Sequence, residues 1–336
     1  MHIYCRGGKC MNKNAKIALI GSGIAAAAVG AASLAVTNNL VKVALDREMP
    51  KATDRSRRRL TGTEDLGELM ETLSQAGEVL KRSGTEAVMI FSADGEKLVG
   101  HWQPREDAKR VIIAMHGWRS CWASDFGLIA PFWQENGCSV LYPEQRGQGE
   151  SGGEHIGFGL TERYDCLEWI RWVNGRTGGK LPIYLAGISM GAATVLMAAG
   201  LQLPENVRGI IADCGYTSPH DIWKHIMNRN LHLPYGTVTR SVVGRACRRR
   251  IHMGPKDYSC TLALKKSRVP VLFIHGADDH FVPVEMTYEN YKACASPKRL
   301  LIVPGAEHGM SYLVNRQGYE EALTAFWREN DHRAPD

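Results

Sequence analysis

One pentapeptide in the sequence has residue types suited to nucleophilic catalysis. Gly187-Ile-Ser-Met-Gly191 follows an apolar, strand-like run and leads into an alanine-rich, helix-like run. A serine at such a sharp strand-to-helix turn projects its hydroxyl from the edge of a sheet, and flanking glycines avoid a Cβ that would crowd the neighbouring strand or helix. Ser189 is therefore the candidate nucleophile.

A serine hydroxyl needs a base to accept its proton and an acid to orient that base. Two later strand-like runs end in suitable groups, Asp279 after the first and His308 after the second. We predict Asp279 as the acid because it stands fifth in a His-Gly-x-x-Asp stretch, and two residues separate it from a following Val-Pro. Asp278 and Asp213 are the alternatives. We predict His308 as the base because it follows the last strand.

This chemistry also needs backbone N–H groups that stabilise the developing oxyanion. The residue directly after the nucleophile, Met190, is one expected donor. The other is expected in the loop after the strand at 110–115, and we assign it to Trp118. Its side chain would then be free to line the substrate pocket, although a core position is the alternative for this tryptophan.

The elements that must position these residues alternate along the chain from residue 86. This alternation predicts a mostly parallel sheet of eight strands with helices on both faces. A hairpin at Asp94-Gly95 joins the first two strands, and a capping-box pattern at Thr61 predicts a helix that precedes the sheet. Strands are predicted at 87–91, 97–102, 110–115, 139–143, 182–186, 208–213, 269–275 and 299–303, and helices at 124–136, 161–174, 190–201, 284–294 and 317–329.

A long interval at about 216–266 interrupts this alternation and predicts a small helical lid over the carboxyl edge of the sheet. It contains a cluster of arginines, among them Arg240, Arg245, Arg248 and Arg249. A solvated helix face is the first interpretation of this cluster. Contact with an acidic substrate or with anionic lipid is the alternative.

The N-terminal part of the chain differs in composition from the rest. Net charge is +6, but residues 1–59 carry eight net positive charges, so the remainder is slightly acidic and a nucleic-acid-binding face is not indicated. We divide the chain into a basic flank at 1–16, an uncharged transmembrane signal anchor at 17–41, a basic juxtamembrane linker at 42–60 and a catalytic domain at 61–336. The prediction is a membrane-associated protein.

Two alternative interpretations and one open question, the membrane orientation, concern this N-terminal region. The apolar segment could be a cleaved signal peptide. Its Gly21-Ser-Gly23-Ile-Ala-Ala26 stretch also fits a dinucleotide-binding fingerprint, but no second parallel strand is predicted soon after it. The side of the membrane stays open, because nine cysteines without a CxxC pair favour a reducing compartment whereas a signal anchor would export the domain.

From about residue 60 to the end, the sequence resembles the α/β-hydrolase superfamily, and within it membrane-anchored bacterial serine hydrolases of the YqkD type. The similarity extends to cinnamoyl and feruloyl esterases and, more distantly, to prolyl oligopeptidase catalytic domains. In the stretch that ends at Ser151, Glu144 and Gln148 depart from the usual Asp-Gln-Arg-Gly-His-Gly-x-Ser pattern of this superfamily. Arg146 and Ser151 are expected to hold this loop beside the nucleophile. The stretches that carry the resemblance are His116-Gly-Trp118, Pro143-Glu-Gln-Arg-Gly-Gln-Gly-Glu-Ser151, Glu162-Arg-Tyr-Asp165, Gly187-Ile-Ser-Met-Gly191, Ala212-Asp-Cys-Gly-Tyr216 and His275-Gly-Ala-Asp-Asp-His-Phe-Val-Pro283.

The resemblance implies a metal-free and cofactor-free serine hydrolase that cleaves small carboxylic esters through an acyl-enzyme, with Trp118 and Tyr216 in the substrate pocket. A peptidase of the prolyl oligopeptidase type and a hydrolase of acyl lipids or thioesters are alternatives within the class. A non-catalytic, membrane-tethered binding protein is the remote alternative. The oligomeric state is not predicted.

Overall fold

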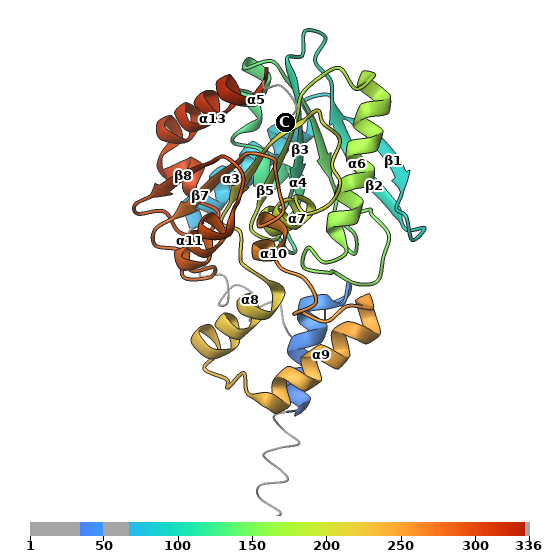
Figure 1. The fold of residues 1–336 in the computed structure, drawn as a ribbon, viewed down its shortest axis with the longest axis vertical. Coiled ribbons are helices and arrows are strands. Elements are labelled where there is room, and N and C mark those ends of the chain that lie inside the picture. The colour runs from blue at the N-terminus through green and yellow to red at the C-terminus, as the bar shows by residue number, and fades with distance from the viewer. Residues whose placement is uncertain (1–33, 50–66, 333–336) are drawn as a thin grey trace, which may run out of the picture.

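The computed structural model describes residues 34–49 and 67–332, which are organised around one twisted sheet (Figure 1). The strand order is β1-β2-β4-β3-β5-β6-β7-β8. The β1–β2 and β2–β4 pairs are antiparallel and all other pairs are parallel, which confirms the predicted eight-stranded, mostly parallel sheet. The strands are β1 (Glu86–Phe91), β2 (Lys97–Gln103), β3 (Arg110–Met115), β4 (Cys138–Pro143), β5 (Ile183–Ile188), β6 (Val207–Asp213), β7 (Val271–Gly276) and β8 (Lys298–Val303), each ending within two residues of its prediction.

Both faces of the sheet are covered, because alternate residues of the central strands belong to two separate cores. Along β3, Val111 and Ile113 pack with α6 and α7, whereas Ile112 packs with α4, α5 and α13. All three side chains are fully buried, as expected of a parallel strand between two helical layers. The helices of these layers are α3 (Gly67–Lys81), α4 (Trp122–Phe126), α5 (Ala130–Glu135), α6 (Glu162–Thr177), α7 (Met190–Ala198), α11 (Val284–Ala293), α12 (Ser311–Val314) and α13 (Arg316–Asn330).

The single helix predicted at 124–136 is wrong, because the chain forms two short helices there, α4 and α5. Pro131 lies in the first turn of α5 and has no N–H to continue a preceding helix. Gly127, directly after α4, is so close to α3 that a Cβ at this position would lie 2.6 Å from the Ala76 carbonyl carbon. Close packing on α3 therefore accompanies the break.

The interval between β6 and β7 is helical, as predicted. It contains α8 (Pro219–His225), a π-helical turn η2 (Ile226–Asn230), α9 (Thr237–Ile251) and α10 (Cys260–Leu264). In Figure 1, α10 lies beside α7 at the sheet, whereas α8 and α9 form a lobe beyond the sheet. We refer to α8, η2 and α9 together as the cap.

A helix at residues 34–45 lies in the same lobe as α9 (Figure 1). Val41 and Leu45 are buried in the same core as Val243 and Cys247 of α9. The boundary predicted between residues 41 and 42 thus falls inside a helix that packs on the cap. Most of the predicted membrane segment, residues 17–33, and the dinucleotide-like motif lie outside the described residues. Across 34–49 and 67–332, no helix combines the length and the apolar character that crossing a bilayer requires.

Candidate active site

Ser189 occupies the sharp turn between β5 and α7, with a left-handed φ of 56° and a ψ of −116°. This strained backbone conformation is typical of functional positions. Its glycine neighbours have no room for a side chain: a Cβ on Gly191 would lie 1.8 Å from the Met115 carbonyl oxygen, and one on Gly187 would lie 2.3 Å from Gly191. Close packing of α7 on β3 and β5 therefore requires the two glycines that the sequence places around Ser189.

The structure brings His308 and Asp279 to this serine from the loops after β8 and β7. His308 Nε2 lies 2.9 Å from Ser189 Oγ, and His308 Nδ1 lies 2.7 Å from Asp279 Oδ2. Asp278 is exposed, whereas Asp279 is buried. Asp213 is also buried but accepts a hydrogen bond from Ser311. Of the three acids considered from the sequence, Asp279 is the one within hydrogen-bond distance of His308.

The Asp279 carboxylate is held in its ionised form. Burial alone would raise its pKa, but His308 and a hydrogen bond from His275 outweigh burial and lower the pKa of Asp279 below its ordinary range. Its other oxygen, Oδ1, accepts the backbone N–H groups of Phe281 and Val282 at 2.9 and 2.8 Å. Conversely, burial disfavours the charged form of His308, yet the Asp279 carboxylate raises the pKa of this imidazole well above 6.5.

A second histidine supports Asp279, and its role was not predicted from the sequence. His275 is fully buried at the end of β7, with Nε2 placed 3.1 Å from Asp279 Oδ2 and 2.8 Å from the Val282 carbonyl oxygen. Its Nδ1 lies 2.6 Å from Thr287 Oγ1. His275 begins the His-Gly-x-x-Asp stretch that identified Asp279, so the sequence held a signal for this contact.

The loop at 116–120, hereafter the oxyanion loop, lies directly beside the nucleophile. A Cβ on Gly117 would be 3.6 Å from Ser189 Cβ. Asp125 of α4 holds this loop in place, because its carboxylate accepts the Gly117 N–H at 2.6 Å and the Ser120 hydroxyl. The backbone N–H groups of Trp118 and Met190 donate to no other described residue. Sequence reasoning missed Asp125, and no spacing pattern in the sequence points to it.

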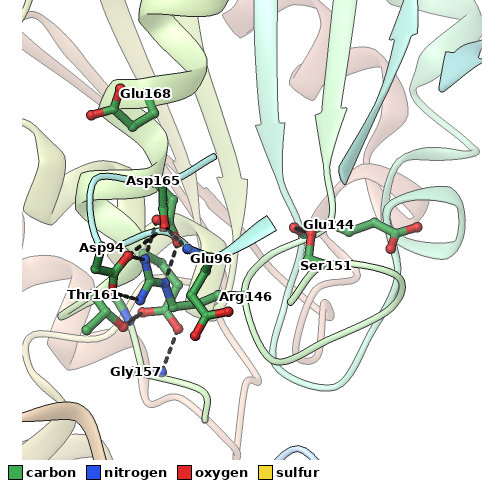
Figure 2. A network of polar contacts seen from close by, with 12 residues as sticks. Asp94, Glu96, Glu144, Arg146, Ser151, Gly157, Thr161, Asp165 and Glu168 are labelled. Carbon is green, nitrogen blue, oxygen red and sulfur yellow. Dashed lines mark hydrogen bonds and ion pairs between the residues drawn. The ribbon is translucent and has the colours of Figure 1, made fainter. Parts of the chain in front are cut away.

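The loop after β4 supports the oxyanion loop from the other side. Gln148, one of the two departures from the usual motif, accepts the Arg119 backbone N–H at 2.6 Å. Arg146 fixes this loop through two-point contacts with Asp165 and Asp94, as Figure 2 shows. Ser151 Oγ donates to the Glu144 carbonyl oxygen at 2.5 Å. Arg146 and Ser151 thus hold the loop geometry, as expected from the sequence.

A pocket that is partly open to solvent lies at Ser189. Trp118 and Tyr216, the two residues predicted to contact substrate, both line it. Tyr216 is buried and donates its hydroxyl to the Phe158 carbonyl oxygen at 3.0 Å, while Trp118 Nε1 donates to the Ala44 carbonyl oxygen at 2.9 Å. Because these polar groups are already paired, both side chains present apolar surface to the pocket.

The same site contains a group of potential metal ligands. Cys214, Asp279 and His308 offer ligand atoms that lie within 4.8 Å of one another. Burial raises the pKa of the Cys214 thiol to about 11, which disfavours the thiolate that a metal would need. A bound cation would also compete for the Asp279 oxygen and His308 nitrogen that contact each other. These atoms are therefore better suited to proton transfer than to metal binding.

The fold agrees with the comparison to known proteins. A family model described as "alpha/beta hydrolase fold" matches residues 110–242, which run from β3 through Ser189 into the cap. This match and the fold support the assignment of the chain to the α/β-hydrolase superfamily. The relative YqkD of Bacillus subtilis (strain 168) is 28% identical over 240 residues, which cover 71% of this chain and 78% of YqkD.

Among solved structures, this chain is similar to an esterase from Pyrococcus furiosus, with a TM-score of 0.61 and 21% identity over 74% of this chain and 92% of the esterase. It is also similar to an acylaminoacyl peptidase solved with Z-Gly-Gly-Phe-chloromethyl ketone, with a TM-score of 0.56 and 17% identity. That match covers 75% of this chain and 42% of the peptidase. At these identities the two structures show a shared fold.

Proposed function

We propose that this protein is a serine hydrolase that cleaves carboxylic esters through an acyl-enzyme. The observation that carries the proposal is the continuous hydrogen-bonded series from Ser189 Oγ through His308 to Asp279, at the mouth of an apolar pocket. This arrangement matches what a general base and its orienting acid require. A serine nucleophile gives an acyl-enzyme that water must release, so both half-reactions use the same base.

In the first half-reaction, Ser189 Oγ attacks the ester carbonyl carbon while His308 Nε2 accepts the serine proton. The carbonyl oxygen then carries the negative charge, and the N–H groups of Met190 and Trp118 are the donors placed to stabilise it. As the intermediate collapses, the bond to the leaving alkoxide breaks and His308 returns the proton to that oxygen. Water repeats these steps with the acyl-enzyme, which releases the carboxylic acid and regenerates Ser189.

The charge states of the site suit these roles. Ionised Asp279 stabilises the imidazolium that forms when His308 accepts the proton, and its contact with Nδ1 leaves Nε2 facing the serine. The raised pKa of His308 makes this imidazole a stronger base. The same raised pKa means that a larger share of His308 is protonated in the free enzyme at neutral pH and cannot accept the serine proton. Maximal activity is therefore expected on the alkaline side of neutrality.

Peptide hydrolysis is the second candidate within this class, and the fold shared with an acylaminoacyl peptidase is compatible with it. The pocket favours esters. A peptide would bring backbone N–H and C=O groups into a space lined almost wholly by apolar side chains, where unpaired polar groups are costly. The acyl part of an ester has no such groups beyond the carbonyl, which the oxyanion donors would receive.

A substrate panel tests this proposal. Purified full-length protein is assayed with p-nitrophenyl esters and with aminoacyl p-nitroanilides, and Ser189→Ala serves as the control for background hydrolysis. We expect turnover of esters that the Ser189→Ala variant lacks. A preference for the anilides would replace the esterase proposal with peptidase activity. If the protein turned over neither substrate type and a fluorophosphonate did not label Ser189, the result would favour a non-catalytic binding protein.

We also propose that the N-terminal segment attaches the protein to a membrane. Thr37 and Val41 are buried in the folded body, so a span would have to end before Thr37. Residues 17–36 contain no charged side chain, and a helix of about 20 residues is long enough to cross a bilayer. The test is alkaline carbonate extraction of membranes from expressing cells. The full chain is expected in the pellet and a chain beginning at Thr37 in the supernatant; recovery of the full chain in the supernatant would contradict the anchor.

A further inference from the structure

The helix at 34–45 forms one wall of the pocket at Ser189. Leu40, Val41 and Val43 line the pocket from this helix, and Ile222, Met227 and Val243 line it from the cap. These side chains are purely apolar, and Ser189 lines the same pocket. The space between helix and cap is therefore suited to a hydrocarbon chain whose carbonyl end reaches the nucleophile.

The carboxyl end of this helix is joined to the oxyanion loop. The last carbonyl groups of a helix have no partner within the helix. Here the Arg119 guanidinium donates to the Val43 oxygen at 2.8 and 3.0 Å and to the Arg47 oxygen at 3.2 Å, while Trp118 Nε1 donates to the Ala44 oxygen. The residues that secure the helix are thus the predicted oxyanion donor and its neighbour in the chain.

Asp46 and Arg47, which follow the helix, contact α9 and the loop after β4. Asp46 forms an ion pair with Arg250 of α9, with oxygen-to-nitrogen distances of 2.5 and 3.2 Å. The Arg47 side chain donates to the carbonyl oxygens of Ser151 and Gly149 in the loop after β4. The helix is therefore fixed to the cap, to the oxyanion loop and to the loop after β4, all of which border the active site.

We infer that the helix at 34–45 is the acyl-binding wall of the active site, and that the substrates are esters of extended, unbranched hydrocarbon chains lying between this helix and the cap. This inference rests on the proposed ester hydrolysis. Each methylene buried in the pocket should raise kcat/KM about fourfold until the space is filled, which corresponds to about 0.8 kcal/mol. Leu40 then determines acyl-chain length.

The test compares two leucines on this helix. Full-length wild type, Leu40→Trp and Leu34→Trp are assayed with p-nitrophenyl esters from acetate to laurate. Leu34 is exposed and does not line the pocket, so its variant controls for the added bulk. For Leu40→Trp we expect the ratio of decanoate to acetate kcat/KM to fall at least about tenfold, which corresponds to the loss of fewer than two buried methylenes. We also expect the acyl chain with the highest kcat/KM to become shorter. For Leu34→Trp we expect the wild-type profile.

A second variant keeps the inference testable if Leu40→Trp does not fold. Leu40→Ala enlarges the pocket and should move the best substrate to a longer chain. If wild type hydrolyses esters but its chain-length profile is the same in both Leu40 variants, the helix is not the acyl wall and the inference is overturned. If wild type hydrolyses no ester at all, the proposed function itself fails, so the two failures are distinguishable.

Discussion

His275 Nε2 lies 3.1 Å from the same Asp279 oxygen, Oδ2, that contacts His308 at 2.7 Å. One carboxylate oxygen therefore meets two imidazole rings, one buried and one facing the nucleophile. His275 is fixed in turn by Thr287 and by the Val282 carbonyl oxygen. This places His275 as a positioning residue that holds Asp279 in the orientation His308 needs.

Replacing His275 should impair catalysis without removing any group that touches substrate. For His275→Ala we expect kcat to fall about 10- to 100-fold, because small misplacements of catalytic groups have effects of this size. His275→Gln keeps a side-chain N–H donor and should recover part of the loss. The control is His225→Ala, whose ring is half-buried at the end of α8 and contacts the His280 carbonyl oxygen only at 3.4 Å. Equal activity of wild type and His275→Ala would contradict this role.

The pH dependence of kcat/KM should follow His308. The base must be neutral to accept the serine proton, so activity should rise with pH through a pKa above 6.5, the ordinary value. Because the Asp279 carboxylate raises that pKa, Asp279→Asn should move the acid limb to lower pH. The same variant should lower kcat by about 10⁴-fold. An acid limb that stays at the wild-type pH in Asp279→Asn would show that another group controls it.

The Arg146 contacts should contribute to stability rather than to chemistry. Asp165 is only 3% exposed in its ion pair with Arg146, and removing one partner of a buried pair costs about 3–5 kcal/mol. We therefore expect Arg146→Ala to lower the free energy of unfolding by that amount in urea titrations. Arg171 is 61% exposed in its ion pair with Glu168, so Arg171→Ala should cost less than about 1 kcal/mol. Similar losses of unfolding free energy in both variants would refute a specific stabilising role of the buried Arg146 contacts.

Two glycine-to-alanine substitutions should have opposite effects. Gly191→Ala would place its methyl group 1.8 Å from the Met115 carbonyl oxygen, so α7 must move and Ser189 with it. We expect lower thermal stability and loss of activity. Gly175 lies within α6, where an added methyl group would meet nothing within 4 Å, and Gly175→Ala should stabilise the protein by up to about 1 kcal/mol. Differential scanning calorimetry distinguishes these outcomes; a Gly191→Ala variant with wild-type Tm would be inconsistent with the observed packing.

Much of the sheet was predictable because each strand is a short apolar run between turn residues. The nucleophile turn was predictable because its glycine spacing is local in the sequence, although only Gly187 is required by a contact within the turn and Gly191 is required by its contact with Met115 of β3. The order of serine, acid and histidine along the chain then indicated which strand ends would meet. Asp278 and Asp279 could not be separated by composition, and their different burial depends on tertiary packing.

The helix at 34–45 was not predictable as part of the pocket. Its apolar residues continue an uncharged segment, and apolar side chains suit a lipid surface as well as a protein core. Arg119 is a second example, because its φ of 52° and its hydrogen bonds to helix carbonyls arise only when distant segments meet. Neither relationship leaves a periodic or spaced pattern in the sequence.

Covalent labelling of Ser189 tests the central claim most directly. The full-length protein is treated with a fluorophosphonate, and the modified residue is located by peptide mass spectrometry. We expect one phosphonate per chain on Ser189, with labelling slowed in His308→Ala, since the imidazole accepts the serine proton. A properly folded wild-type protein that stays unlabelled, or one labelled equally in Ser189→Ala, would contradict the account.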